Sequence, residues 1–583
     1  GSGGNSMSSG GSLANCGGSP TLSGTNTSLG ASSAVSVPKG GTFGVGGAVS
    51  ISGSEATGGS VPTPTGGHAA NGSGTSVTGG TSSSGGHSAM GGSSAATSTI
   101  TGGRAALGGT STMGGSVTTG GSSIAGGVGA VGGAQSCPAI PGAPAGLQPL
   151  PSAAQVAYQR TELTAFIHFS MATYDGTEQG NTSDLPTMFN PTNLDSTTVG
   201  QWASSLKSAG FGQSMLVTKH SIGFCLWPSK YTTYSVKSCN WMSGNGDIVQ
   251  LWSDAMRDAG MRPALYLGPW DQKYTSSKTD YETYFKNQIA ELFAYGPAYE
   301  IEFDGYNAPT TNVNWKSVFQ YLKGLQPNIL IWAGPEIVKT GAVPDLQWIG
   351  NENGQGTRST SSVDTKNCGG GSNWCPYECN VSDRRPNWFW HPNQNPMTLS
   401  DMQSIYFATV GMNCTLNFNV PPSQTGEFDA KDIALLQQFG AWYSALYTTN
   451  LAKGQTAACD STWASVGFEA SKAIDGDICT YWAAASGKKT GRLEVTFATS
   501  SPVKLISIRE PIELGERSTA YHVELKQNGS WNKAPTDKSG AQIKGTVIGQ
   551  RQLWQLDSAT AEAIALVIDS AKDVPAIAEF SAY

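Results

Sequence analysis

The sequence predicts an α/β protein: a (β/α)8-type barrel, an all-β sandwich after it, and a Gly/Ser-rich segment, expected to be disordered, before it. Three observations lead to this fold class. Short apolar runs alternate with amphipathic stretches from about residue 151, this alternation stops near residue 447, and glycine is concentrated before residue 137. We expect four parts: a tether over 1–136, the barrel over 137–446, a linker over 447–456 and the sandwich over 457–583.

The first part lacks the residues that a folded core requires. Residues 1–136 hold 40 of the 76 glycines, one aromatic residue (Phe43) and three charged residues (Lys39, Glu55 and Arg104). Ordering a backbone costs about 1–2 kcal/mol per residue, and so little apolar surface cannot offset that cost. We therefore expect a disordered Gly/Ser/Thr tether, which suggests attachment to, or reach from, a cell surface or a larger assembly.

The second part repeats one pattern. Residues 163–170 (LTAFIHFS) form a short apolar run, and a helix is expected over 196–209. Short buried strands that alternate with amphipathic helices indicate parallel βα units, and this many units favour a closed barrel over an open sheet. Further strands are expected within 213–220, 262–271, 298–305, 328–336 and 345–352, and further helices over 246–260, 278–296 and 313–324.

Polar side chains follow the predicted barrel strands where each strand ends. Barrel enzymes build their sites at this end of the strands. For any single residue, helix capping or loop solvation is an equally good explanation, but the shared placement favours a site. The residues are His168, Lys219, His220, Trp270, Asp271, Asp304 and Glu352.

Two carboxylates among aromatic rings at a barrel mouth suit glycoside hydrolysis. Aromatic faces stack on sugar C–H surfaces. One carboxylate attacks the sugar or activates water, while the other protonates the leaving oxygen. The pattern alone does not name the sugar.

The last part changes character. Apolar segments separated by turn residues indicate an antiparallel β-sandwich. The predicted strands include GRLEVTF (491–497), VKLISIRE (503–510), YHVELKQ (521–527) and EAIALVID (562–569).

Composition excludes two classes of partner. The net charge is −7 and the Lys and Arg residues are scattered, so there is no basic stripe for nucleic acid. No run of 18 apolar residues exists, so no transmembrane segment is expected.

Cysteine usage favours an oxidising compartment, and we expect a secreted or surface-tethered protein. Zinc at Cys368, Cys375 and Cys379 is the weaker alternative, because no His lies in that run and no fourth ligand is apparent. The close sequence clusters are Cys225 with Cys239, Cys368 with Cys375 and Cys379, and Cys459 with Cys479.

Seven motifs occur in order over residues 160–425: AFIHFS, TKHSIGFCLWPSKYTTYSV, YLGPWD, EIEFDG, DLQWIGNENG, ECNVSDRRPNWFWHP and TVGMNCTLNFNVPPSQTG. Together they resemble the α-L-fucosidases of glycoside hydrolase family 29. The pairing of GNE with WFWH is similar to the branch that prefers α-1,3- and α-1,4-linked fucose. The resemblance implies a retaining hydrolase that removes terminal fucose from glycans and needs no cofactor for its chemistry.

The resemblance also implies roles for individual residues. Asp304 of EFDG matches the nucleophile. Glu352 of GNE matches the acid/base, with Glu378 as second choice, because another branch uses a later Glu before the aromatic motif. The implied substrate-binding residues are His168, Glu178, Lys219, His220, Trp227, Tyr231, Trp270, Arg384 (or its neighbour Arg385), Trp388 and His391. Trp227 equally suits a place in the core, and His391 equally suits a structural hydrogen bond.

The chain departs from the family pattern at several positions. Ser221 and Ile222 stand where the family has a second His and an Asp, Gln179 replaces a Trp, Glu302 replaces the Trp before the nucleophile, and Gln347 replaces an Arg. Glu302 lies two residues before Asp304, so both side chains would face the same side of a strand. It is either a third acid/base candidate, since nearby anions raise each other's pKa, or an ion-pair partner of Lys219 or Arg262, which we expect.

These departures keep two alternatives open. The site either accepts a different sugar by the same mechanism, or it belongs to a tethered lectin that binds fucosylated glycans without cleaving them. The last domain, with AIDGDICTYWAA and VIGQRQLWQL, resembles galactose-binding-like sandwiches of the discoidin and carbohydrate-binding-module type. A structural calcium at Asp475, Gly476 and Asp477 is possible there, although DGD is also an ordinary turn.

Overall fold

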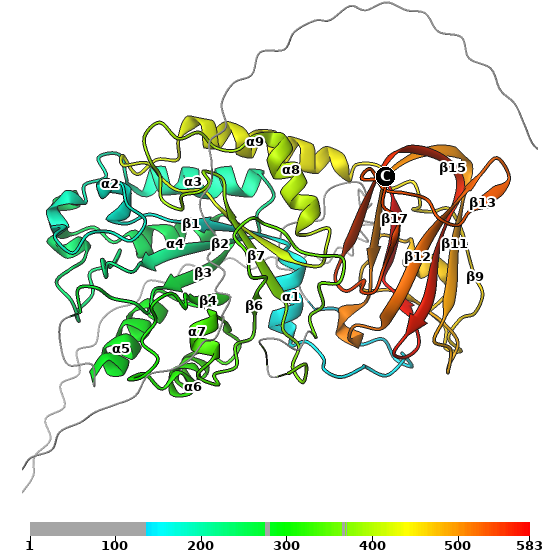
Figure 1. Cartoon of the computed structure of the whole chain (residues 1–583), viewed down its shortest axis with the longest axis horizontal. Coiled ribbons are helices and arrows are strands. Elements are labelled where there is room, and N and C mark those ends of the chain that lie inside the picture. The colour runs from blue at the N-terminus through cyan, green and yellow to red at the C-terminus, as the bar shows by residue number, and fades with distance from the viewer. Residues whose placement is uncertain (1–135, 275–279, 364–367, 369) are drawn as a thin grey trace, which may run out of the picture. The chain divides into compact units, whose positions relative to one another are not determined.

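The structure, a computed structural model, describes residues 136–274, 280–363, 368 and 370–583, so the expected tether lies outside the described residues apart from its last position. Eight parallel strands form one sheet in the order β5-β4-β3-β2-β1-β8-β7-β6, and a parallel bridge between Trp332 and Leu346 connects its two ends. This confirms the barrel (Figure 1). The strands are β1 (Leu163–Ile167), β2 (Gln213–Lys219), β3 (Arg262–Leu267), β4 (Glu300–Phe303), β5 (Leu330–Ala333), β6 (Gln347–Trp348), β7 (Tyr377–Ser382) and β8 (Thr415–Asn419).

Several of the helices that connect these strands begin at side-chain caps. Asp195, Asp247 and Asn314 each accept a hydrogen bond from a backbone N–H of the first turn of the following helix. The helices are α1 (Ala153–Thr161), α2 (Ala172–Asp175), α3 (Ser196–Ser208), α4 (Ile248–Asp258), α5 (Tyr281–Phe293), α6 (Trp315–Leu325), α7 (Pro335–Val338), α8 (Leu399–Ala408) and α9 (Ala430–Leu446). Of those predicted from the sequence, α3 to α5 lie inside their expected ranges, and α6 ends one residue beyond its expected range.

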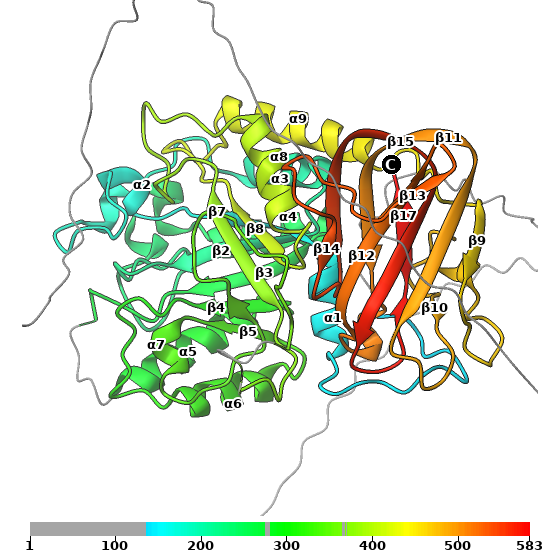
Figure 2. The ribbon, with the colours of Figure 1, turned by 45° about the vertical axis from the view of Figure 1, so that its right-hand side comes forward.

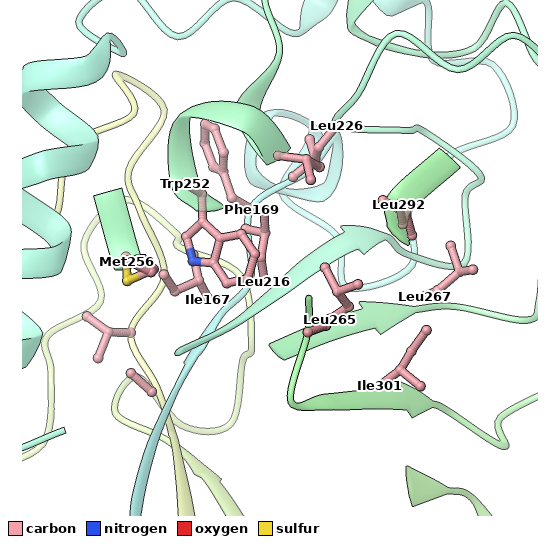
Figure 3. Packing of buried hydrophobic residues seen from close by; sticks show 14 of the residues in the cluster. Ile167, Phe169, Leu216, Leu226, Trp252, Met256, Leu265, Leu267, Leu292 and Ile301 are labelled. Atoms are coloured by element: carbon pink, nitrogen blue, oxygen red, sulfur yellow. The ribbon is translucent and has the colours of Figure 1, made fainter. Parts of the chain in front are cut away.

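Alternate residues of each strand face two different environments. One set packs outward against the helices: Trp252 of α4 lies against Ile167 and Leu216 (Figure 3). The other set points into the barrel, where Phe166, Met215 and neighbouring residues form a separate apolar cluster that contacts Trp388. The inward set therefore lines the barrel and is the set available to a site at its mouth.

The C-terminal part is an antiparallel β-sandwich, as predicted (Figures 1 and 2). The prediction of separate strands at 491–497 and 503–510 was wrong, because both belong to one long strand that pairs with β15 through two register shifts. The strands are β9 (Thr456–Cys459), β10 (Trp482–Ala483), β11 (Gly491–Arg509), β12 (Ser518–Gln527), β13 (Ser530–Asn532), β14 (Lys544–Gly545), β15 (Gln552–Ala571), β16 (Ala576–Ile577) and β17 (Glu579–Ala582).

A buried ion-pair cluster joins the barrel to the sandwich. Glu162, between α1 and β1, accepts from Arg509 at 2.6 Å and from Arg551 at 2.7 Å. Burial alone would raise the pKa of Glu162, but the two guanidinium groups outweigh it and the pKa is lowered. We call Glu162, Arg509 and Arg551 the junction cluster.

Three disulfides connect cysteines of the described chain: Cys137 with Cys479, Cys368 with Cys375, and Cys379 with Cys414. The expected clusters were therefore only partly correct. Cys225, Cys239 and Cys459 carry free thiols, and Cys479 bonds to a residue 342 positions away instead of its sequence neighbour. The zinc alternative fails, because all three of its proposed ligands are in disulfides.

Candidate active site

A cavity of about 430 Å³ opens among the residues that follow or end the barrel strands. Its polar lining is dominated by carboxyl and imidazole groups, and its apolar lining by aromatic rings. The lining residues are Phe166, His168, Glu178, Gln179, His220, Tyr266, Glu302, Asp304, Tyr306, Trp332, Pro335, Glu336, Trp348, Glu352, Asn380, Pro386 and Trp388.

Asp304 lies directly after β4 and is held by two donors. The Tyr266 hydroxyl donates to Oδ2 at 3.0 Å, and the backbone N–H of Tyr306 donates to Oδ1 at 2.9 Å. Behind it the chain approaches β5 closely, because a Cβ on Gly334 would lie 2.2 Å from the backbone nitrogen of Gly305. Glycine at these two positions thus permits the tight packing that places the carboxylate at the cavity wall.

Glu352 reaches the same cavity from the loop after β6. Its Oε2 accepts from the indole N–H of Trp388 at 3.3 Å. Burial raises the pKa of Glu352, and the negative charges of Asp304 and Glu178 raise it further, against the opposing effect of the Trp388 hydrogen bond. The carboxyl group is consequently easier to protonate than an ordinary Glu, which is what a proton donor requires.

His168 is oriented by Asn419 of β8. The Asn419 amide NH₂ donates to the Trp388 carbonyl at 2.7 Å, which can only accept, so the amide oxygen faces His168 Nδ1 at 2.8 Å. Nδ1 therefore carries the proton, and Nε2 is left as an acceptor. Burial lowers the pKa of His168 well below its usual value, with the neighbouring His220 adding to the effect, so the ring is neutral at neutral pH.

His220 stacks on Tyr266 with ring centroids 5.9 Å apart, and its Nδ1 lies 3.1 Å from the Ser221 hydroxyl. That hydroxyl also lies 2.6 Å from the side-chain oxygen of Gln179. Burial lowers the pKa of His220, although Asp304 and Glu178 oppose the shift. Two of the departures from the family pattern, Ser221 and Gln179, thus contact each other, and Ser221 also contacts the His220 ring.

Glu178 joins two loops at the cavity rim. One carboxylate oxygen accepts from the backbone N–H of Trp388 at 2.8 Å, and the other lies 2.8 Å from His391 Nε2. His391 does not line the cavity, so its structural alternative is the one that the contacts favour. By holding the Trp388 loop, Glu178 also helps to place the indole that contacts Glu352.

Several predicted substrate-binding residues lie away from the cavity. Lys219 is fully buried and pairs with Asp271 at 3.2 Å, while Arg384 is buried against Asp432 at 2.8 Å. Trp227 is buried too and donates its indole N–H to Glu291, which agrees with its place in the core.

Two predicted aromatic contacts, Tyr231 and Trp270, also lie outside the cavity lining. Tyr231 is 47% exposed and is not among the lining residues. Trp270 contacts the cavity indirectly, through an edge-on contact with Tyr306 at a centroid distance of 5.5 Å.

Glu378, the second choice for the acid/base, lies inside the barrel with no accessible surface. It precedes the cavity-lining Asn380 by two residues of β7, which places it one layer deeper on the same face. Burial raises the pKa of Glu378 to about 7. In this position the carboxyl group does not reach the cavity.

The two cations expected to pair with Glu302 contact other residues. Lys219 pairs with Asp271, and Arg262 contacts Thr161 and the ring of Tyr299. Glu302 lines the cavity, and its Oε2 is buried without a hydrogen-bond partner among the described residues. Gln347, another departure, is buried outside the cavity and donates to the Cys375 carbonyl.

Sequence reasoning missed part of the lining. Tyr266, Trp332 and Asn380 lie within strands, where no polar strand end marks them, although their inward position follows from the two-residue period. Glu336 lies in the first turn of the short helix α7 and adds another carboxyl group to the wall.

No group of three or more His, Cys, Asp or Glu side chains is arranged to hold a metal within the described chain. A calcium site at Asp475, Gly476 and Asp477 stays a prediction. Asp475 accepts from the Thr480 hydroxyl at 2.8 Å and from the backbone N–H of Asp477, and Asp477 accepts from that of Cys479. Both carboxylates thus accept hydrogen bonds from groups within their own turn. Among the same residues, no helix combines the length and apolar character that crossing a bilayer requires.

Comparison with known proteins shows the families of both folded domains. The family model described as alpha-L-fucosidase matches residues 146–446, and that described as F5/8 type C domain matches residues 455–580. Alpha-L-fucosidase 1 of Arabidopsis thaliana is 32% identical over 466 residues, which cover 76% of this chain and 88% of the relative. Putative alpha-L-fucosidase 1 of Oryza sativa subsp. japonica is 31% identical and covers 76% and 86%.

Solved structures are similar over the same span. A putative alpha-L-fucosidase from Bacteroides thetaiotaomicron shares 28% identity with a TM-score of 0.70, covering 76% of this chain and 99% of that one. A GH29 fucosidase of Ruminococcus gnavus in complex with fucose shares 26% identity with a TM-score of 0.67, covering 79% and 98%. The chain therefore belongs to the alpha-L-fucosidase family of glycoside hydrolases and carries an F5/8 type C domain after its barrel.

Proposed function

We propose that the protein hydrolyses terminal α-linked L-fucose from oligosaccharides or glycoconjugates by a retaining double displacement. The observation that carries the proposal is that Asp304 and Glu352 line the same cavity, whereas Glu378 does not. Asp304 is the nucleophile and Glu352 the acid/base. The fucose named in the Ruminococcus gnavus complex supports the choice of sugar.

In the first step, Asp304 attacks the anomeric carbon while Glu352 protonates the departing glycosidic oxygen. The Tyr266 hydroxyl and the Tyr306 N–H stabilise the negative charge of Asp304 before the attack. They stabilise it again when Asp304 departs as a carboxylate in the second step. The raised pKa of Glu352 favours the protonated form that this step requires.

In the second step, water attacks the glycosyl-enzyme ester with Glu352 as the base. Asp304 is one of the charges that raise the pKa of Glu352, and esterification neutralises it. The pKa of Glu352 therefore falls when the ester forms, which suits its change from acid to base.

The preference for α-1,3- and α-1,4-linked fucose is part of the proposal. It is supported by the contact between the two motifs that carry the resemblance, since Trp388 of WFWH donates to Glu352 of GNE. An exported location is proposed as well, supported by the three disulfides.

The test is fucose release from an aryl α-L-fucoside, 2′-fucosyllactose and a Lewis-type trisaccharide by wild type, Asp304→Ala, Glu352→Ala and Glu378→Ala. We expect wild type to prefer the Lewis-type sugar, Asp304→Ala to be inactive, and Glu352→Ala to retain activity only on the aryl substrate. NMR of the first product should show the α anomer. Glycan binding without release from any substrate would contradict the proposal and favour a lectin.

A further inference from the structure

Glu302 occupies a central place in the cavity wall. It lies on the same face of β4 as Asp304, two residues away, and both line the cavity. The sheet register places it opposite Tyr266 of β3 and Trp332 of β5. Tyr266 also donates a hydrogen bond to Asp304. Glu302 therefore lies between the tyrosine that contacts the nucleophile and the indole ring of Trp332.

Two polar atoms in this row lack partners. The Oε2 of Glu302 and the indole N–H of Trp332 are both buried without a hydrogen bond in the described chain. The two residues are only 3% and 4% exposed, so bulk water does not satisfy them. A buried polar group without a partner costs about 1–3 kcal/mol, which a bound hydroxyl-rich ligand would recover.

The neighbouring groups that most affect the pKa of Glu302 are carboxyl groups. Burial raises its pKa well above the usual value, and Glu378, Asp304, Glu300 and Glu352 raise it further. The Tyr266 hydroxyl on the adjacent strand donates to Asp304, and the buried cation of β2, Lys219, pairs with Asp271. The raised pKa favours the protonated form of Glu302, which has one O–H donor and one carbonyl acceptor.

We propose that Glu302, as a protonated carboxylic acid, donates a hydrogen bond to a hydroxyl of the sugar bound at Asp304 and thereby sets which sugars the cavity accepts. The indole N–H of Trp332 donates to the same part of the ligand. This inference deepens the proposed function, since it assigns a specificity-determining residue to the same site. A neutral donor here binds a hydroxyl without adding a second anion beside the nucleophile.

The test combines variants with substrate analogues. Wild type, Glu302→Gln and Glu302→Leu are assayed on an aryl α-L-fucoside and on its monodeoxy analogues. Glu302→Leu is expected to lower kcat/KM on the parent sugar by roughly 5- to 150-fold. For wild type, kcat/KM should be lower by a similar factor on one monodeoxy analogue than on the parent sugar. For Glu302→Leu, kcat/KM should be the same on that analogue as on the parent sugar. Glu302→Gln keeps a hydrogen-bond donor and should retain most of the wild-type activity.

Glu300→Gln is the matched control, because Glu300 lies two residues earlier on the same face of β4 but outside the cavity lining. Its discrimination among the analogues should equal that of wild type. If Glu302→Leu lowers kcat/KM by the same factor on every analogue, Glu302 contacts no substrate hydroxyl and the inference is wrong.

A second measurement does not depend on turnover. Infrared difference spectra between wild type and Glu302→Gln at pH 7 should show the carbonyl band of a protonated carboxylic acid. Carboxylate bands in its place would overturn the inference even in an active fucosidase. If the acid band is present but no fucoside is cleaved, the proposed function fails. Calorimetric titration of wild type and Glu302→Leu with fucose and its deoxy derivatives then decides whether Glu302 binds a hydroxyl. Unequal losses of affinity among these ligands in Glu302→Leu support the inference, and equal losses or no binding refute it.

Discussion

Two buried glutamates of this molecule, Glu162 and Glu302, behave in opposite ways. In the junction cluster, Glu162 is neutralised by Arg509 and Arg551, and its pKa is lowered. At the barrel mouth, burial raises the pKa of Glu302 and neighbouring carboxyl groups raise it further. The same side chain therefore favours its ionised form in one place and its protonated form in the other. Burial raises the pKa in both, and the nearby charges decide the outcome.

The largest expected effect is at the nucleophile. Asp304→Asn keeps the shape of the side chain but cannot form the glycosyl-enzyme, so kcat should fall by about 10⁴-fold or more. The melting temperature should not fall, because the change removes one anion from a cluster of anions. Initial rates on an aryl fucoside, together with calorimetry, check both statements. A large loss of stability would indicate that the cavity carboxylates act structurally, as in the junction cluster.

The next effect is at the acid. Glu352→Gln should lower kcat on a natural glycan by about 10²–10⁴-fold and much less on an aryl fucoside with an activated leaving group. In wild type, activity should decline as the pH rises past the raised pKa of Glu352, and the variant should lack this limb. A pH–rate profile of both proteins tests this. An unchanged profile would remove Glu352 from the acid role.

At the junction cluster the expected effect is on stability. Arg551→Ala leaves Glu162 buried with one guanidinium fewer, which should cost about 3–5 kcal/mol and lower the melting temperature. Arg257→Ala is the control, since Arg257 pairs with Asp254 while the two side chains are 31% and 58% exposed, and its loss should cost about 0–1 kcal/mol. Equal shifts for the two variants would mean that the junction cluster contributes no more than a surface ion pair.

The smallest expected effect is a pH dependence. The pKa of Glu378 is raised to about 7 in the folded protein, so its contribution to stability is fully present below the unfolded value and is lost as the pH rises through about 7. Glu378→Gln cannot titrate, so its melting temperature should vary less between about pH 5 and pH 8 than that of wild type. Parallel curves would show that Glu378 does not titrate in this range.

The sequence predicted the barrel well because its signals are local. The apolar runs and the two- and 3.6-residue periods appear within each element, and polar residues at strand ends identified Asp304, His168 and His220 as neighbours. Pairing between distant residues was not predictable. Lys219 and Arg384 carry the right chemistry for a sugar site, but Asp271 and Asp432 bind them elsewhere.

Strand interiors caused the other gaps. Trp332 lines the cavity from within a strand that reads as uniformly apolar, and no local signal separates it from the core. The two strands expected at 491–497 and 503–510 are one, because the Ser and Pro residues between them form irregular pairing, where a turn was expected.

The disulfide between Cys137 and Cys479 has a topological consequence. It joins the residues that precede the barrel to the sandwich that follows it, while the peptide chain joins the same two domains at residues 447–456. The barrel and its neighbour therefore form a covalent ring that contains the whole barrel sequence. A single protease cut in the 447–456 segment would open this ring, but the disulfide would still join the two fragments. Only reduction of the disulfide would remove the last covalent bond between the barrel and the sandwich.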